Sequence, residues 1–311
     1  MESFLCTIAI CLVAVRAIPL EEFYPYNLSV NQQLIANDDA SSRAITLDPP
    51  ITFYGRSYNS CKIHNNGLVT FNTPPQHFIE APFPVENYTF IAPFYGDVDT
   101  RMSGTVWFTD PVINESSVLD KVENDIHDTF RDHAYFKPAY VIIATWDQVG
   151  YFKERSDKLN TFQCIITSDG CASFVIFLYN EIQWTTNESN SMSKHAKIGF
   201  NDGTLFMSRQ VPCSMTMNLK EISRTSNVGI AGKWIFRVDT TNFSTCHNDY
   251  AMACESDPFC SCSTPDPQQK CICTDLKEDI PQCSYVPVTT PTTTPTTTPT
   301  TTPTTPTTDV N

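Results

Sequence analysis

Basic side chains are scarce in this sequence. It has 20 Lys and Arg residues against 34 Asp and Glu, which gives a formal net charge of −14 at pH 7. Binding to nucleic acid or to an acidic membrane surface needs clustered positive charge, so this balance argues against both kinds of partner. It is compatible with a basic or cation-rich partner.

Long apolar runs are also lacking. No run reaches the roughly 18 residues that a membrane-spanning helix needs. A short apolar block at residues 4–15 leads into Val15-Arg16-Ala17, where the small Ala17 suits cleavage by signal peptidase. We therefore predict a signal peptide at residues 1–17 and a secreted protein, although Glu2 stands where a basic residue is usual. The alternative interpretation of this block is a buried N-terminal strand.

The common catalytic motifs are missing as well. The sequence has no HExxH zinc motif, no G-x-S-x-G elbow, no P-loop and no Rossmann glycine pattern, and its six histidines show no ligand spacing. Asp97 and Asp99 would face one side of a strand, where two carboxylates could form an acid–base pair or bind a hard cation. A charge pair with Arg101, or side-chain hydrogen bonds that order the turn before Gly104, is the favoured role. We predict no enzyme, no cofactor and no metal site.

Residues 140–184 predict a β-sheet core. They contain three apolar runs rich in β-branched and aromatic residues, at Tyr140–Trp146, Thr161–Thr167 and Ser173–Tyr179. The third run is apolar on both alternating sides, which predicts a strand covered on both faces. Asp169-Gly170 predicts a tight hairpin turn before it, and the charged residues 153–158 predict a loop between the first two runs. We predict a mainly β (α+β) globular domain.

Shorter β segments are predicted around this core. They lie at Ile51–Tyr54, Leu68–Phe71, Thr105–Thr109 and residues 196–203. The first is predicted to be an edge strand. Four prolines between residues 74 and 84 mark a long surface connection, because proline cannot donate a hydrogen bond to a strand ladder.

Residues 116–133 are predicted to form the one amphipathic helix of the domain. An apolar residue recurs at every fourth position: Val118, Val122, Ile126 and Phe130. Ser117, with Asp120 three residues later, resembles a capping box at the start of the helix. The apolar stripe predicts a helix that packs on the core.

Thirteen cysteines are more than a cytosolic protein of this size usually carries, and they indicate an oxidising compartment. Removal of Cys6 and Cys11 with the signal peptide would leave eleven, an odd number. Seven of these lie in residues 246–283, a segment too polar to bury a core, which predicts a small module held by disulfides. Metal binding is the alternative, and it is disfavoured because the segment has a single histidine, His247.

Residues 286–311 are almost entirely threonine and proline. Such a composition cannot form a core and favours an extended, polyproline-like chain. In a secreted protein it is typical of an O-glycosylated, mucin-like stalk; the alternative is an unmodified disordered tail. The segment lacks the hydrophobic tail of a GPI signal, so we expect no membrane anchor.

Five N-x-[ST] sequons fall in segments predicted to be loops or linkers, where a bulky glycan can be accommodated. Their acceptor residues are Asn27, Asn87, Asn114, Asn187 and Asn242. We expect most of them to be glycosylated.

A series of short motifs follows the order typical of one extracellular family. The motifs are Asn66-Gly67 with Phe71, Ile91 to Phe94, Asp97 to Arg101, Thr145 to Asp147, Asn160 to Gln163, Gln183 to Thr185, Gly199 to Asn201 and Ser226 to Gly229. On these motifs, residues 18–240 resemble the nidogen extracellular (NIDO) domain family. Tyr95-Gly96 and Cys61 depart from the family's usual residues, and Cys61 suggests an extra disulfide. The resemblance implies a protein-binding domain with a role in adhesion.

The cysteine-rich segment 246–283 resembles an EGF-like module in the order of six cysteines and in their C-x-C step. The resemblance implies the bridges Cys246–Cys260, Cys254–Cys271 and Cys273–Cys283. The Gly-aromatic pair that such modules carry is absent from residues 274–282. Cys262 is surplus to the pattern, and we expect it to be free or to link two chains as a disulfide-bonded homodimer.

Four further cysteines lie in the globular domain: Cys61, Cys164, Cys171 and Cys213. These four can form two further bridges, and the sequence leaves their pairing open.

These features together predict a secreted, non-enzymatic glycoprotein of the extracellular matrix or of an apical surface. It would act in cell–matrix adhesion or matrix organisation by binding matrix or cell-surface proteins through the NIDO domain. The alternative function is that of a mucin-like barrier component, in which the globular head organises a glycan-bearing tail.

Overall fold

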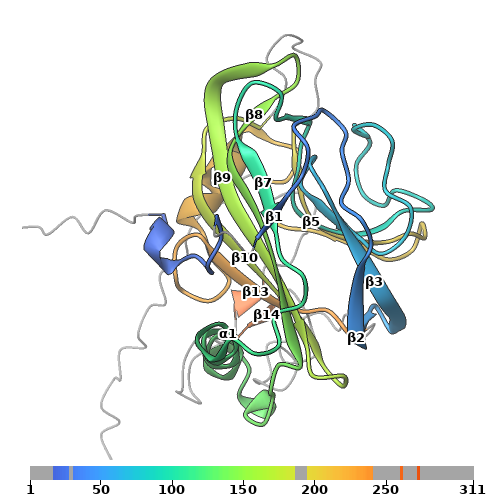
Figure 1. Cartoon of the computed structure of the whole chain (residues 1–311), viewed down its shortest axis with the longest axis vertical. Coiled ribbons are helices and arrows are strands. Elements are labelled where there is room, and N and C mark those ends of the chain that lie inside the picture. The colour runs from blue at the N-terminus through green and yellow to red at the C-terminus, as the bar shows by residue number, and fades with distance from the viewer. Residues whose placement is uncertain (1–16, 28–30, 186–194, 241–259, 262–271, 274–311) are drawn as a thin grey trace, which may run out of the picture.

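The protein is built on two antiparallel β-sheets packed face to face (Figure 1). The computed structural model describes residues 17–27, 31–185, 195–240, 260–261 and 272–273. Outside these ranges lie residues 1–16 of the predicted signal peptide, most of the cysteine-rich segment and the Thr/Pro tail.

The first sheet, here called the helix-side sheet, carries the central strands predicted from the sequence. Its order is β1 (Gln32–Gln33), β7 (Thr105–Phe108), β8 (Tyr140–Tyr151), β9 (Arg155–Ser168), β10 (Ser173–Ile182) and β13 (Lys233–Arg237), and β6 (Val98–Asp99) pairs with β8.

The second sheet, here called the loop-side sheet, has six strands. Their order is β12 (Ser208–Gln210), β11 (Lys197–Asp202), β5 (Thr89–Tyr95), β4 (Leu68–Thr70), β3 (Arg56–His64) and β2 (Ile45–Phe53). The predicted edge strand is confirmed, because β2 ends this order. Two further short strands, β14 (Cys260–Ser261) and β15 (Ile272–Cys273), pair with each other in the cysteine-rich segment.

Strand β10 is covered on both faces, as its sequence predicts. Phe174, Ile176 and Leu178 pack in the cluster beneath the helix, whereas the alternating residues 175, 177 and 179 belong to the core between the sheets. Gly170 makes the predicted hairpin turn from β9 with φ +91°, a conformation that favours glycine. Strands β8 and β9 extend further than predicted: the charged residues 155–158 lie within β9, and Tyr151 pairs with Arg155.

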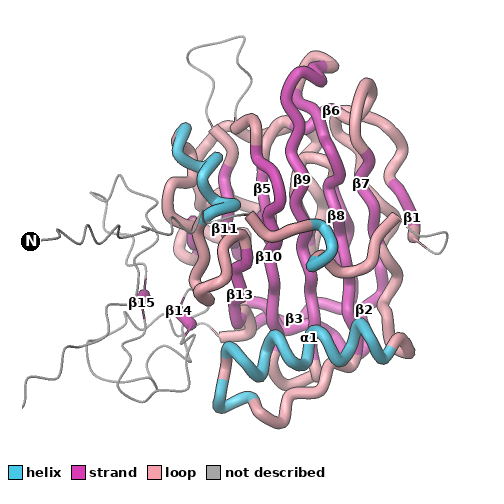
Figure 2. The backbone as a smooth tube through the Cα atoms, turned by 90° about the vertical axis from the view of Figure 1, so that its left-hand side faces the viewer, coloured by secondary structure: helices cyan, strands magenta, loops and turns pink. Residues whose placement is uncertain are grey.

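The single α-helix, α1 (Ser116–Thr129), runs across the outer face of the helix-side sheet near one end of its strands (Figure 2). Val118, Val122 and Ile126 are buried against this sheet, so the predicted stripe is confirmed. The predicted capping box is wrong. Glu115 is the residue before the helix and makes no side-chain cap, and Ser117 lies inside the first turn, where its hydroxyl cannot cap the end.

Three 3₁₀ helices supplement α1. They are η1 (Leu20–Glu22), η2 (Arg131–His133) and η3 (Met217–Arg224). The predicted helix at residues 116–133 therefore consists of two elements, α1 and η2. The N-terminal segment packs beside α1, where Tyr24 donates its hydroxyl hydrogen bond to Asp125 over 2.8 Å.

The proline-rich connection at residues 72–88, here called the covering loop, closes the outer face of the loop-side sheet. Phe83 and Val85 of this loop pack with Leu68, Phe90 and Tyr95 of the sheet. The sequence predicts a surface connection here, but the loop also buries part of its own apolar side chains. As a result, both outer faces of the sandwich are covered.

Lys197 of β11 holds the covering loop to the sheet. Lys197 is fully buried, and its ammonium group donates to the carbonyl oxygens of Ile79 and Ala81. Three aromatic rings surround the ammonium at 4.6–5.6 Å: Tyr95, Phe78 and Phe83. A buried lysine is tolerated only with such partners.

The two further bridges that the sequence allows among the four domain cysteines are not formed. Cys61 and Cys164 are buried free thiols in the core between the sheets, and Cys171 is an exposed free thiol at the β9–β10 turn. Cys213 is disulfide-bonded, so its partner is none of these three. The apolar strand positions that Cys61 and Cys164 occupy suit a small hydrophobic thiol as well as they suit a bridge.

No helix in the described part of the chain is long and apolar enough to cross a membrane.

Candidate functional site

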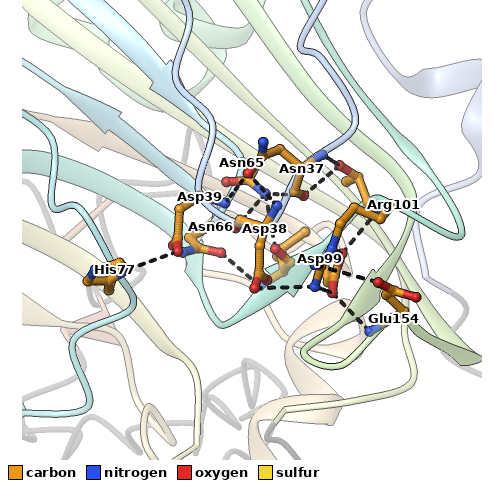
Figure 3. Close-up of polar contacts among 11 residues, drawn as sticks. Asn37, Asp38, Asp39, Asn65, Asn66, His77, Asp99, Arg101 and Glu154 are labelled. Carbon is orange, nitrogen blue, oxygen red and sulfur yellow. Dashed lines mark hydrogen bonds and ion pairs between the residues drawn. The ribbon is translucent and has the colours of Figure 1, made fainter.

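Five carboxylates from three segments far apart in the sequence lie near one another, and we call this group the acidic cluster. Figure 3 shows four of them with their polar contacts. Its members are Asp38, Asp39, Asp97, Asp99 and Glu154. Asp38 and Asp39 precede β2. Asp97 is the residue before β6, Asp99 is the last residue of β6, and Glu154 lies in the turn between β8 and β9. The sequence points to Asp97 and Asp99 alone, because nothing in the chain order shows that the other three join them.

Two fully buried asparagines hold the acidic cluster in place. The side-chain amide of Asn65 donates to the carbonyl oxygens of Asp38 (2.7 Å) and Val98 (3.0 Å). Asn66 donates to the Asp39 carboxylate over 2.8 Å and accepts from the Val98 backbone N–H over 2.9 Å. These contacts tie the segment before β2 to the start of β6, so the carboxylates sit on a fixed frame.

The glycine after these asparagines is required by close packing. Gly67 has φ +79°, and a Cβ there would lie 1.8 Å from the carbonyl oxygen of Phe94. His64 supports the same turn: its Nδ1 accepts from the Asn66 N–H over 3.1 Å, so its Nε2–H faces the Pro75 oxygen at 3.0 Å. Burial lowers the pKa of His64, which keeps the ring neutral. The Asn65-Asn66-Gly67 motif therefore builds the frame and is not itself the site.

Asp99 and Arg101 form the charge pair predicted from the sequence. Arg101 donates to both carboxylate oxygens of Asp99, and the Glu154 backbone N–H donates to one of them over 2.9 Å. Burial acts to raise the pKa of Asp99, but these hydrogen bonds outweigh it and lower the pKa overall. The pair is therefore structural, and Asp99 remains ionised.

Asp97 is the member of the cluster whose charge is not compensated. No hydrogen bond or ion pair joins its carboxylate to another residue that the structure describes. Burial, together with the charges of Asp38, Asp39 and Asp99, raises the pKa of Asp97 to about 7. At neutral pH it is therefore poised between its neutral and ionised forms.

Basic side chains also lie at the acidic cluster. Among the described residues no group of three or more His, Cys, Asp or Glu has the arrangement of a metal site. Two basic residues line its edge, Arg101 and His77, and His77 lies 3.2 Å from Asp39. A Lys or Arg side chain of a partner would relieve the repulsion around Asp97, since opposite charge favours the ionised carboxylate.

Three of the five predicted glycosylation sites lie in the described residues. Asn27, Asn87 and Asn114 are all exposed, as attachment of a glycan requires. Asn187 and Asn242 lie outside the described residues. So do the side chains of the cysteines in segment 246–283, and the EGF-like pairing and the role of Cys262 remain predictions.

Comparison with known proteins identifies the fold. The family model of the nidogen-like domain (NIDO) matches residues 59–240. The chain belongs to the nidogen-like domain family. The two sheets also include β1 and β2, which begin before the matched region.

The nidogen-like domain is shared with tectorins and nidogens. Human alpha-tectorin is 34% identical over 237 residues, covering 73% of this chain and 11% of the relative. Drosophila melanogaster nidogen is 33% identical over 234 residues, covering 72% and 17%. Human nidogen-1 is 25% identical over 244 residues, covering 71% and 19%.

The chain spans less than a fifth of the length of each of these three relatives. No solved structure matches it.

Proposed function

We propose that this chain is a secreted, non-enzymatic glycoprotein of the extracellular matrix that acts in cell–matrix adhesion or matrix organisation. The nidogen-like domain would supply the surface that binds matrix or cell-surface proteins. Support comes from the family membership, from the predicted signal peptide and from the exposed asparagines of three sequons. The chain's cysteine-rich segment and Thr/Pro tail would act as a spacer and a stalk.

The acidic cluster is the proposed contact for a basic segment of the partner. The observation that carries this proposal is the uncompensated carboxylate of Asp97, whose pKa is raised to about 7 by burial and by neighbouring acids. The frame of Asn65 and Asn66 fixes these acids before a partner arrives, which lowers the ordering cost of binding. The overall charge of −14 would also attract a basic partner at long range.

A capture experiment tests both parts of this proposal. The full secreted chain would be immobilised and exposed to native matrix extract at two salt concentrations, with bound proteins identified by mass spectrometry. We expect capture of proteins with basic segments, weakened by salt and by Asp97→Asn combined with Asp39→Asn. Asp120→Asn, which changes an exposed carboxylate on α1, is the matched control.

Two results would contradict the proposal at different levels. Capture that is equal for the wild type and the double variant would rule out the acidic cluster as the contact but leave the adhesion role. Capture that requires only the Thr/Pro tail, lost on truncation after residue 285, would favour the mucin-like alternative.

A further inference from the structure

The turn that carries Asn87 is fixed against the hairpin between β11 and β12. The Asn87 backbone N–H donates to the Gly203 carbonyl oxygen over 2.9 Å. Thr89, the third residue of the sequon, donates its hydroxyl hydrogen bond to the Asp202 carbonyl oxygen over 3.0 Å. Asn201 of β11 holds the same turn, since its side-chain amide accepts from Val85 N–H over 2.9 Å. The sequon and the hairpin are therefore one rigid unit.

The Asn87 side chain itself is available for modification. The residue is exposed, and its side-chain amide makes no hydrogen bond to any residue that the structure describes. Its backbone φ is +70°, a left-handed conformation that asparagine tolerates well. Asn87 therefore lies in the turn of residues 86–87, whose backbone is hydrogen-bonded to Gly203.

The tip of the neighbouring hairpin exposes two large apolar side chains. The Asp202 N–H donates to the Met207 carbonyl oxygen over 3.1 Å, which closes a short loop of residues 203–206. Within it, Phe206 is 93% exposed and Leu205 is 57% exposed. Two adjacent apolar side chains this exposed form a small apolar surface, and a covering group would remove it from water.

We propose that an N-linked glycan on Asn87 lies over Phe206 and Leu205. Gly203, which accepts the Asn87 N–H, is only three residues from Phe206, so the aromatic ring is within reach of the first sugars. N-acetylglucosamine presents a face of C–H bonds that packs on the electron-rich face of an aromatic ring. The proposal rests on the proposed secretion, because N-glycosylation takes place in the secretory pathway.

A thermal-unfolding cycle on the full secreted chain tests this contact. Phe206→Ala is compared in the glycosylated protein and in an Asn87→Gly background, which loses the sequon and accepts a positive φ. We expect Phe206→Ala to lower the Tm of the glycosylated protein by about 2–4 °C and to leave the unglycosylated background unchanged. Tyr135→Ala, an exposed aromatic far along the chain from this turn, should shift both backgrounds equally.

Removal of N-glycans from the folded protein by a peptide N-glycosidase gives a second unglycosylated background, in which all sequons lose their glycans and hydrolysis leaves aspartate at position 87. An equal effect of Phe206→Ala with and without the glycan would overturn the inference. So would glycopeptide mapping that finds Asn87 bare while Asn27 or Asn114 carries a glycan. Absence of glycan from every sequon would instead overturn the proposed secretion, and the inference with it.

Discussion

At the residue scale, two carboxylates of the acidic cluster have pKa values shifted in opposite directions: the pKa of Asp97 is raised and that of Asp99 is lowered. Asp99 is ionised because Arg101 and a backbone N–H bind it, whereas Asp97 is half-buried near the same charges with no described partner. The two residues look equivalent in the sequence, and the difference arises from what the surrounding turns place beside each. This difference makes Asp97 the residue to test first.

We predict that Asp97→Asn stabilises the protein at pH 8 and has no effect near pH 4. The folded pKa is raised to about 7, above the value of about 3.9 for an unfolded aspartate. Stability associated with Asp97 is therefore present below about pH 4 and is lost as the pH rises to 7. After allowance for solvent screening, the gain at pH 8 is about 1–2 kcal/mol in urea unfolding.

The control for this prediction is Asp120→Asn, which should not change the pH dependence of unfolding. An Asp97→Asn protein that is less stable than the wild type at pH 8 would contradict the raised pKa. That outcome would show that the Asp97 carboxylate has a stabilising partner.

We predict that alkylating reagents distinguish the three free cysteines of the sandwich. Cys171 is exposed and should react in the native protein, whereas Cys61 and Cys164 should react only after unfolding. Burial raises the pKa of Cys61 to about 12, so the reactive thiolate is scarce as well as inaccessible. Peptide mass mapping after native and denaturing alkylation, without reductant, measures all three.

The same alkylation experiment can also contradict the prediction that Cys61 and Cys164 are free thiols. If Cys61 and Cys164 stay unmodified after unfolding without reductant, both are in disulfide bonds and the free thiols of the structure do not persist. Cys171→Ser should abolish native labelling at this turn.

At the element scale, one buried lysine binds the covering loop to its sheet. The loop has no regular hydrogen bonding of its own, and Lys197 supplies two donors to its backbone and a charge for three aromatic rings. Its position within the apolar strand β11 gives no sign of this role in the sequence. The loop also carries His77, which contacts the acidic cluster.

We predict that Lys197→Ala costs about 2–4 kcal/mol of unfolding free energy, because it leaves buried carbonyl oxygens unpaired and opens a cavity. Limited proteolysis should then cut within residues 72–88. Lys197→Met keeps most of the side-chain volume and should recover part of the loss. Lys121→Ala, which removes a partly exposed lysine 5.2 Å from the Tyr24 ring, is the control and should cost less than about 1 kcal/mol.

An undisturbed covering loop in Lys197→Ala would show that the apolar side chains of the loop hold it without the lysine. In that case proteolysis patterns of the variant and wild type would coincide.

At the scale of the whole molecule, Cys213 links the sandwich to something outside it. Cys213 is disulfide-bonded, and the other cysteines described in the sandwich are free. With residues 1–17 predicted to be removed, its expected partner is a cysteine of segment 246–283. Such a bridge would tether the cysteine-rich segment to the nidogen-like domain.

We predict that proteolysis after residue 240 separates the two parts only under reducing conditions. The sandwich should survive mild reduction up to about Asp239, because its stability comes from buried apolar strands. Release of the tail without reductant would place the partner of Cys213 elsewhere, in a second chain. Loss of both parts together would contradict the expected domain boundary.

We also predict which cysteine links two chains, if the secreted protein runs as a disulfide-bonded dimer on non-reducing gels. The sequence points to Cys262 as the surplus residue, provided that it is not the partner of Cys213, and the structure adds Cys171 as an exposed free thiol. Cys262→Ser and Cys171→Ser are compared side by side, and loss of the dimer in one variant identifies the bridge. A dimer that persists in both would exclude these two residues.

Much of the fold is determined by the sequence itself. Alternating apolar residues in Ser173–Tyr179 predict a strand buried on both faces, and the four-residue spacing from Val118 predicts the stripe of α1. These patterns are local, because side chains alternate along a strand and recur along a helix whatever the rest of the chain does. The charge pair of Asp99 with Arg101 is predicted for the same reason, since the two residues are neighbours.

Only the tertiary structure decides which distant residues meet. Asp38 and Asp39 lie near Asp97 because of the sheet order, and Lys197 donates to the Ile79 carbonyl oxygen for the same reason. The Asn87 turn is likewise hydrogen-bonded to the hairpin that carries Phe206. It also leaves Cys61 and Cys164 unpaired, against the expectation from their number. Strand order and register fix these contacts across long sequence separations, and no local pattern of residues encodes either of them.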